Sequence, residues 1–156
     1  MGTREDRFAG YREARLWVRD DRGRVLMEVR PDDSGATTGR FPFDVGAHVL
    51  TAVNPGAERP SPRENERRQR ALVARLPAGT SRWEAEAGAA DGSHRERSVL
   101  VTGLSDDEAF AIAGRWGQDA IFRWTPQAWS VLPCDGGPAS HTGWLLIAQT
   151  GERSRR

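Results

Sequence analysis

The sequence predicts an α+β fold: a ferredoxin-like βαββαβ core with two helices on one face of an antiparallel sheet, extended by an N-terminal β-hairpin and extra C-terminal strands. Three observations lead to this prediction. Strand and helix patterns alternate through the middle of the chain in the order of a split βαβ fold. Two segments begin with the Ser-x-x-Glu signature of a helix N-terminus. The 156 residues suffice for one domain and are too few for two, so we expect a single domain over residues 1–156.

An N-terminal β-hairpin is predicted over residues 14–30. Apolar and polar side chains alternate from Ala14 to Arg19 and again from Val25 to Val29, which is typical of half-buried strands. Asp20-Asp21-Arg22-Gly23 between them is a turn sequence. The polar, glycine-containing stretch from Pro31 to Gly39 is expected to be a loop.

The core is predicted over residues 48–132 and begins with a strand from His48 to Val53. Asn54-Pro55-Gly56 is a turn signal, and a residue before proline favours extended geometry, which we therefore expect at Asn54. A helix follows from Ser61 to about Leu76, because Ser61 and Glu64 have the spacing of a capping box.

The second half of the core repeats this alternation. Strand patterns at Trp83–Ala87 and Ser98–Thr102 flank a loop at residues 88–95. A second capping box, at residues 105–108, starts another helix. This helix ends at Gly117, where a left-handed C-cap residue is expected.

Three more strands are predicted towards the C-terminus. Those at residues 120–124 and 129–132 complete the core, and one at 142–148 follows a loop rich in Gly and Pro. Residues 151–156 are charged and are expected to form a disordered tail. No apolar run approaches the ~20 residues of a membrane-spanning helix, so we expect no membrane association.

The predicted topology brings polar residues from distant junctions to one end of the sheet. The first core strand ends there, the first helix begins there, and the loop between the second and third core strands lies at the same end. The residues that meet there are Asn54, Asn65, His94, Glu96, Ser98 and Gln118. We therefore expect a polar site, flanked by Arg68.

Helix geometry places Asn65 on the inward face of the first helix. At about 100° per residue, Asn65 lies on the same side as Leu72 and Leu76, which form the apolar stripe. A buried amide without a partner costs about 1–3 kcal/mol, so Asn65 needs one. Asn54, Glu96 and a ligand are the three options.

Each candidate has a structural and a functional interpretation. Asn54 either forms a turn that ties the loop to the helix or orients a ligand, and Gln118 either satisfies loop carbonyl groups or faces the site. Arg68 either is solvated or flanks the cluster. Glu96 is the candidate general base or the carboxylate that anchors a ligand; otherwise it is a structural carboxylate held by Arg68 or by backbone donors.

Metal-dependent and nucleophilic chemistry have little support in the sequence. His94 and Glu96 lie on one side of an extended segment, so they suit either a metal or acid–base work. A metal needs a third ligand, and neither His48 nor His141 has a recognisable ligand spacing. Ser98 lacks a glycine-rich nucleophile elbow. We expect no metal and no cofactor.

Five short motifs give the chain a family resemblance. It resembles the bacterial family known as domain of unknown function 3293 over roughly residues 11–132. The motifs are T-A-V-N-P at 51–55, S-P-R-E-N at 61–65, E-x-S at 96–98, V-x-G-L-S-x-x-E-A at 101–109 and G-Q-x-A-I-F at 117–122. The tryptophan often seen before the E-x-S step is replaced here by Gly92-Ser93-His94, so the resemblance supports Glu96 more than His94. It implies an α+β bacterial domain and no particular activity.

Charge and composition exclude several classes of function. The chain has 23 basic residues, all arginine, and 22 acidic ones, for a formal net charge of +1. This balance gives no general attraction to nucleic acid or membranes. A single cysteine, Cys134, indicates a reducing compartment, and residues 1–15 lack the apolar segment of a signal peptide. We therefore expect a cytoplasmic protein.

Two classes of function remain. The first is a site for a polar metabolite, such as a nucleotide or amino-acid derivative, with Glu96 as base or ligand anchor; the sequence leaves open whether this site is catalytic. The second is a non-catalytic interaction module that uses the N-terminal hairpin, where Trp17 lies between Arg15 and Arg19, or an exposed sheet face. RNA binding is the weakest option, because the central strands lack an aromatic and basic surface. The oligomeric state stays open, with a homodimer among the options.

Overall fold

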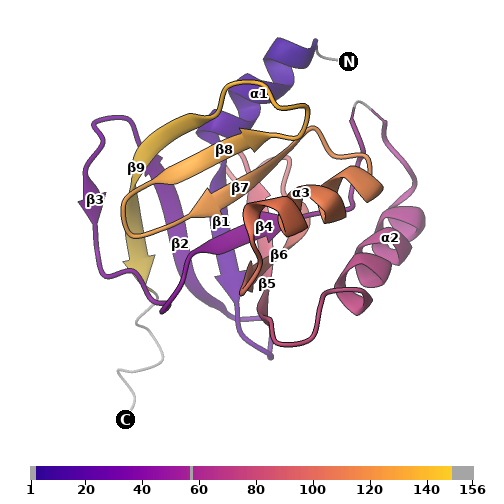
Figure 1. The fold of residues 1–156 in the computed structure, drawn as a ribbon, viewed down its shortest axis with the longest axis horizontal. Coiled ribbons are helices and arrows are strands. Elements are labelled where there is room, and N and C mark those ends of the chain that lie inside the picture. Colours follow the sequence, from indigo (N-terminus) through magenta and orange to yellow (C-terminus); the bar gives the residue numbers. More distant parts are fainter. Residues whose placement is uncertain (1–2, 57, 149–156) are drawn as a thin grey trace.

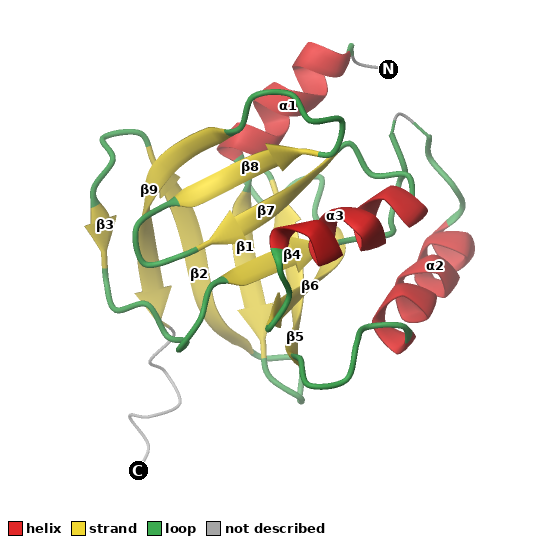
Figure 2. Cartoon of the chain, viewed as in Figure 1, coloured by secondary structure: helices red, strands yellow, loops and turns green. Residues whose placement is uncertain are grey.

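The computed structural model describes residues 3–56 and 58–148, which form a closed, antiparallel β-barrel of eight strands with three helices and one further short strand (Figures 1 and 2). The helices are α1 (Arg4–Glu13), α2 (Pro62–Ala74) and α3 (Asp106–Arg115). The strands are β1 (Arg15–Arg19), β2 (Val25–Asp32), β3 (Thr37–Thr38), β4 (Ala47–Leu50), β5 (Ser81–Gly88), β6 (Glu96–Thr102), β7 (Ala120–Trp124), β8 (Trp129–Pro133) and β9 (Ser140–Ala148).

The barrel is closed by a pairing between strands that are far apart in the sequence. Neighbouring strands follow the order β2-β1-β5-β6-β4-β7-β8-β9, and β2 then pairs with β9 from Met27↔Ala148 to Asp32↔Gly143. All of these pairings are antiparallel, whereas the two-residue β3 lies parallel to β9 on its other side. Closure gives the backbone groups of every barrel strand a neighbour, so the barrel has no long free edge.

The ferredoxin-like prediction, an open sheet with two helices on one face, is therefore wrong. The predicted core strands do lie side by side, in the order β5-β6-β4-β7. However, β5 continues to β1 and β7 continues to β8, so the hairpin and C-terminal strands that we expected as additions form half of the barrel wall. The predicted α+β class is wrong for the same reason, because the closed sheet encloses an apolar core of its own.

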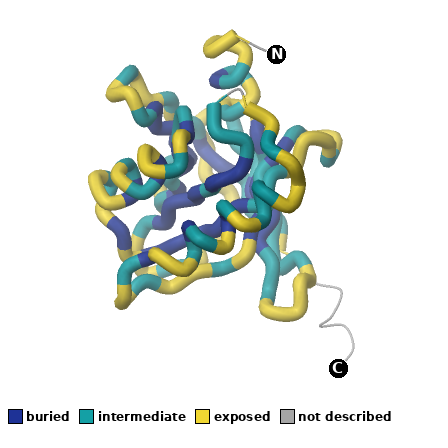
Figure 3. The backbone as a smooth tube through the Cα atoms, turned by 90° about the vertical axis from the view of Figure 1, so that its right-hand side faces the viewer, coloured by how far each residue is buried: buried dark blue, intermediate teal, exposed yellow. Residues whose placement is uncertain are grey.

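Two apolar layers follow from the alternation of side chains along the strands. One layer fills the barrel: Leu16, Val18, Val29, Ala47, Val49, Ala85, Leu100, Phe122, Trp124, Trp129, Val131 and Trp144. The other lies between the outer wall and the helices α2 and α3: Leu50, Ala52, Leu72, Leu76, Val99, Val101, Leu104, Ala109, Ala113, Ile121 and Leu132. Figure 3 shows the buried strands at the centre and exposed loops and helix faces around them.

Local signals placed most helices and strands well. The hairpin at 14–30 is confirmed as β1 and β2, and the capping box of α3 is complete, with Ser105 and Glu108 each bonded to the other's backbone N–H. At α2, Ser61 accepts from the N–H of Glu64, but the Glu64 carboxylate binds Arg67 instead of returning to the cap.

Two elements were not predicted. Helix α1 begins with its own capping box, formed by Thr3 and Asp6, and Phe8 is its buried residue. The expected loop at 31–39 holds the end of β2 and the short β3. The predicted tail at 151–156 lies outside the described residues. Within the described part of the chain, no helix has both the length and the apolar character that crossing a membrane requires.

Candidate functional site

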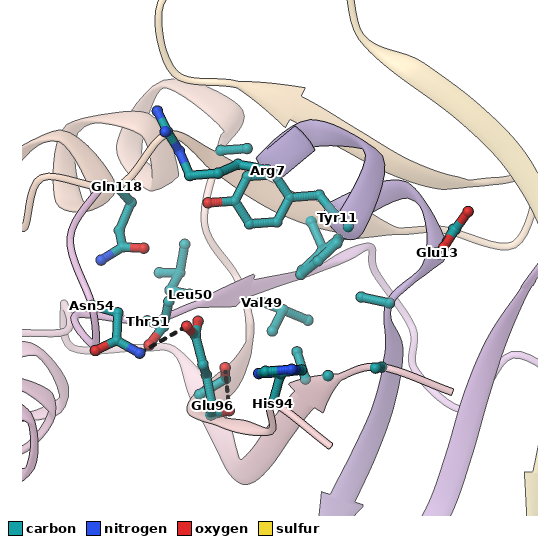
Figure 4. A pocket seen from close by; sticks show the side chains of 18 of the residues that line it. Arg7, Tyr11, Glu13, Val49, Leu50, Thr51, Asn54, His94, Glu96 and Gln118 are labelled. Carbon is teal, nitrogen blue, oxygen red and sulfur yellow. Dashed lines mark hydrogen bonds between the residues drawn. The ribbon is translucent and has the colours of Figure 1, made fainter. Parts of the chain in front are cut away.

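A cavity of about 440 Å³ opens at one end of the barrel, beneath α1 (Figure 4). The inward-facing side chains at this end are small, among them Ala14, Ala87 and Ala120, so they leave space that side chains do not fill. The opposite end is filled by aromatic rings, for example Phe41 against Trp124 at 5.0 Å between ring centroids. Small inward side chains at one end of the barrel and aromatic ones at the other thus leave a pocket at the first end.

Glu96, the first residue of β6, faces this cavity and is only partly satisfied. Its Oε2 accepts a hydrogen bond from Nδ2 of Asn54 at 3.0 Å, and no other hydrogen bond or salt bridge reaches the carboxylate from the described residues. Burial raises the pKa of Glu96, while the Asn54 hydrogen bond and the charges of Arg59 and His94 oppose that rise. The cavity therefore contains a carboxyl group whose pKa is raised by burial and whose other oxygen, Oε1, accepts no hydrogen bond from the described residues, so a ligand can bind to it.

Asn54 is held in place by Asn65. Its backbone N–H donates to Oδ1 of Asn65 at 3.0 Å, and Nδ2 of Asn65 donates to Oδ1 of Asn54 at 2.9 Å. The expected extended geometry at Asn54 is wrong, because its φ is +49°, in the left-handed region that asparagine tolerates better than most residues. Asn65 does not line the cavity; it orients the side chain that does.

Arg68 and Gln118 tie the loop after β4 to the end of α3. Arg68 donates to the carbonyl oxygens of Ala52 and Trp116, both at 2.7 Å, and its guanidinium lies 5.2 Å from the Trp116 ring centre. Gln118 donates from Nε2 to the carbonyl oxygen of Val53 at 3.2 Å. Gln118 lines the cavity and Arg68 does not, so Arg68 supports the loop without facing the site.

His94 and Ser98 complete the set of candidate residues. His94 lies at the exposed rim with φ +53°, and it lines the cavity together with the buried Ser98. The Ser98 hydroxyl donates to the carbonyl oxygen of Glu96 at 3.2 Å, which leaves it no base to activate it. The described residues contain no group of three or more His, Cys, Asp or Glu side chains placed to hold a metal ion.

Comparison with known families gives one match. Residues 50–121 match the family model described as "Protein of unknown function (DUF3293)". The resemblance to the DUF3293 family is thus confirmed over residues 50–121. Searches of curated proteins and of solved structures found no significant match.

The DUF3293 segment contributes the floor and one side of the cavity, and α1 contributes the roof from outside that segment. Figure 4 shows Arg7 and Tyr11 of α1 across the cavity from Glu96 and His94, with Gln118 at one side. Arg7 binds Asp119 through Nε at 2.6 Å, which fastens α1 to the start of β7. Burial, more than any other effect, raises the pKa of the Tyr11 hydroxyl.

Our interpretation of the sequence did not include these roof residues. The capping box at Thr3 and Asp6 is the signal that identifies the helix, and Tyr11 follows Phe8 at the three-residue spacing of one helix face. That signal is weak, because the remaining residues of α1 are mostly charged. It indicates a helix but not that the helix covers a pocket.

Proposed function

We propose that the protein binds a small polar metabolite in the cavity beneath α1, with Glu96 as its anchor. The observation that carries the proposal is the Glu96 carboxylate, which faces a cavity and has one hydrogen-bond donor among the described residues. A volume of about 440 Å³ is within the usual size of ligand pockets. Apolar walls with a few converging polar groups are also typical of such pockets.

The finer form of the proposal is that the metabolite is a nucleotide or amino-acid derivative and that Glu96 takes a proton from it. A carboxyl group whose pKa is raised by burial is a better proton acceptor near neutral pH than an exposed one. Tyr11 lies across the cavity and is available to donate a hydrogen bond. A cytoplasmic location in a bacterial cell belongs to this proposal and rests on the lone Cys134 and the family resemblance.

The alternative, an interaction module on the N-terminal hairpin, gains no support from the hairpin surface. Trp17 is 7% exposed and lies under the Arg95 guanidinium, 3.9 Å from its ring centre. It therefore presents no free aromatic face. The rationale for RNA binding is that an open ferredoxin-like sheet can stack bases on its free face, and the closed sheet that the described residues form has no such open face.

The test is a ligand search with a matched pair of variants. Native mass spectrometry of the purified chain, and thermal shift with a panel of nucleotides and amino acids, are expected to reveal a bound compound. Glu96→Gln should weaken that binding at least tenfold, while Glu84→Gln should not. Glu84 is a suitable control because it lies on the adjacent strand β5 and pairs with Arg97 on the outer wall. If Glu96→Gln and Glu84→Gln bind the compound equally well, Glu96 is not part of the binding site.

A further inference from the structure

The side chains that line the cavity include more negatively than positively charged groups. Three carboxylates line it, those of Asp6, Glu13 and Glu96, against the two guanidinium groups of Arg7 and Arg59. The Arg7 guanidinium already pairs with Asp119, at 2.6 Å. Much of its charge is thus neutralised by protein, so an incoming ligand meets an excess of negative charge.

Glu96 is the most deeply placed of these carboxylates and has no cation beside it. No salt bridge within 4.0 Å reaches it from the described residues. Arg59 and His94, both exposed, act on Glu96 only through space. An ionised carboxylate in such a place lacks the pairing that normally offsets its loss of hydration, and a cationic ligand would supply that pairing.

The rest of the cavity suits an apolar group. Val49 of β4 and Phe122 of β7 line its inner wall, and Ala87 of β5 lines it as well. The Phe122 and Tyr11 rings lie nearly perpendicular to each other, with 6.2 Å between their centres, so an aromatic surface continues from the wall into the roof. A ligand with a compact apolar body therefore finds packing partners within the same space as the carboxylate.

We infer that the cavity takes a small organic amine, whose ammonium group donates to Glu96 while its apolar body packs against Val49 and Phe122. This inference rests on the proposed function, since it names the chemical class of the bound molecule. It is narrower than the two ligand classes named above, because it keeps amino-acid derivatives that carry an ammonium group and excludes nucleotides, which are anions. Neutral molecules have no charge to pair with Glu96.

Three probes with the same aromatic body test the charge requirement: phenethylamine, 2-phenylethanol and phenylacetate. Binding is followed by NMR titration of the Val49 methyl and Phe122 ring signals, which report whether each probe enters the cavity. We expect the amine to bind about tenfold or more tightly than the alcohol, and phenylacetate to bind most weakly. Glu96→Gln should make the amine and the alcohol bind alike, whereas Glu84→Gln should preserve the difference.

The pH dependence of amine binding gives a second measurement. Protonation of Glu96 removes its charge, so amine affinity should fall as the pH is lowered, and binding near the pKa of Glu96 should release a proton. The charged and titratable groups that share the cavity or adjoin it are Asp6, Arg7, Tyr11 and Glu13 on α1, Arg59 before α2, His94 before β6 and Asp119 before β7. The same pH series with Glu96→Gln measures the effect of these other groups on amine binding, and this effect is subtracted. Calorimetry of the unaltered chain in two buffers of different ionisation enthalpy detects the proton that is released on binding.

The outcomes separate this inference from the proposed function. If the alcohol or phenylacetate shifts Val49 and Phe122 at concentrations as low as the amine does, the amine class is wrong while the binding site stands. If none of the three probes shifts those signals at millimolar concentration, the inference is also overturned, and the metabolite panel decides separately whether the cavity binds anything. A preference for the amine that persists in Glu96→Gln would equally contradict it.

Discussion

Replacing Asn65 with alanine tests the arrangement that presents Glu96 to the cavity. The side chain of Asn65 makes two hydrogen bonds to Asn54, one with its backbone N–H at 3.0 Å and one with its side-chain oxygen at 2.9 Å. Asn65→Ala removes both and leaves two partly buried polar atoms of Asn54 without these partners. Asn54 in turn makes the only hydrogen bond to the Glu96 carboxylate from the described residues.

The expected loss of stability follows from these contacts. Each hydrogen bond contributes a net of about 0.5–1.5 kcal/mol, so the two together are worth about 1–3 kcal/mol. Alanine is the better helix former by about 0.5 kcal/mol, which offsets part of the loss because Asn65 lies in the first turns of α2. We therefore expect Asn65→Ala to lower the free energy of unfolding by about 0.5–2.5 kcal/mol.

Urea unfolding, followed by tryptophan fluorescence, measures this change. Arg63→Ala is the matched control, because Arg63 lies on the same turn of α2, is exposed and should change stability by less than about 0.5 kcal/mol. A double-mutant cycle with Asn54→Ala should show a coupling of about 0.5–1.5 kcal/mol, since the two side chains share a hydrogen bond. Equal unfolding midpoints for Asn65→Ala and Arg63→Ala, or strict additivity in the cycle, would refute the arrangement.

Three further predictions concern charge, packing and backbone space. Burial raises the pKa of Glu96 above its ordinary 4.5, so the folded chain holds this proton to higher pH than the unfolded chain, and this group's contribution to stability falls as the pH rises from 4.5 through the folded pKa. Glu96→Gln should therefore gain stability relative to the unaltered chain between pH 4 and pH 8 in urea titrations, and a constant difference would contradict this. Leu72 is a fully buried residue of α2, and Leu72→Ala should lower the free energy of unfolding by about 2–5 kcal/mol; a loss below about 1 kcal/mol would mean that α2 is not packed on the barrel. Gly143→Ala would place a Cβ 1.9 Å from the Ala36 carbonyl oxygen and should lower the melting temperature. At Gly114 an added Cβ meets nothing within 4 Å, so Gly114→Ala should raise the free energy of unfolding by about 0.5–1 kcal/mol. Similar melting temperatures for the two variants would argue against the close approach at Gly143.

Local patterns predicted most of the elements but not the closure of the sheet. Caps, turns and alternation act over a few residues, which is why the hairpin, α2, α3 and β7 were placed closely. The pairing of residues 27–32 with 143–148 joins distant parts of the chain, and the alternation of either strand is equally consistent with an edge or an interior position. An open sheet was therefore the simpler interpretation, and it was wrong.

The polar cluster could be anticipated because it depends on neighbouring strands only. Asn54 and Glu96 meet because β4 and β6 pair antiparallel, and that pairing is common to the predicted sheet and the observed barrel. The division of roles was not predictable: Asn65 and Arg68 lie behind the cavity wall, and Tyr11 comes from a helix with one buried residue. Which polar side chain faces a pocket depends on where the barrel interior is empty, and this depends on the sizes of side chains from all strands together.

The closed ring of strands also limits how this chain can be cut. The stretch at 50–121 that matches the family model holds β5 and β6 but only the end of β4 and the start of β7, and it lacks β1, β2, β8 and β9. Expressed alone, this stretch would expose unpaired strand edges on both sides of its sheet and an apolar inner surface, and both features promote aggregation. The recognisable stretch is therefore not an autonomous folding unit, and fragments intended for solution work should retain everything from α1 to β9.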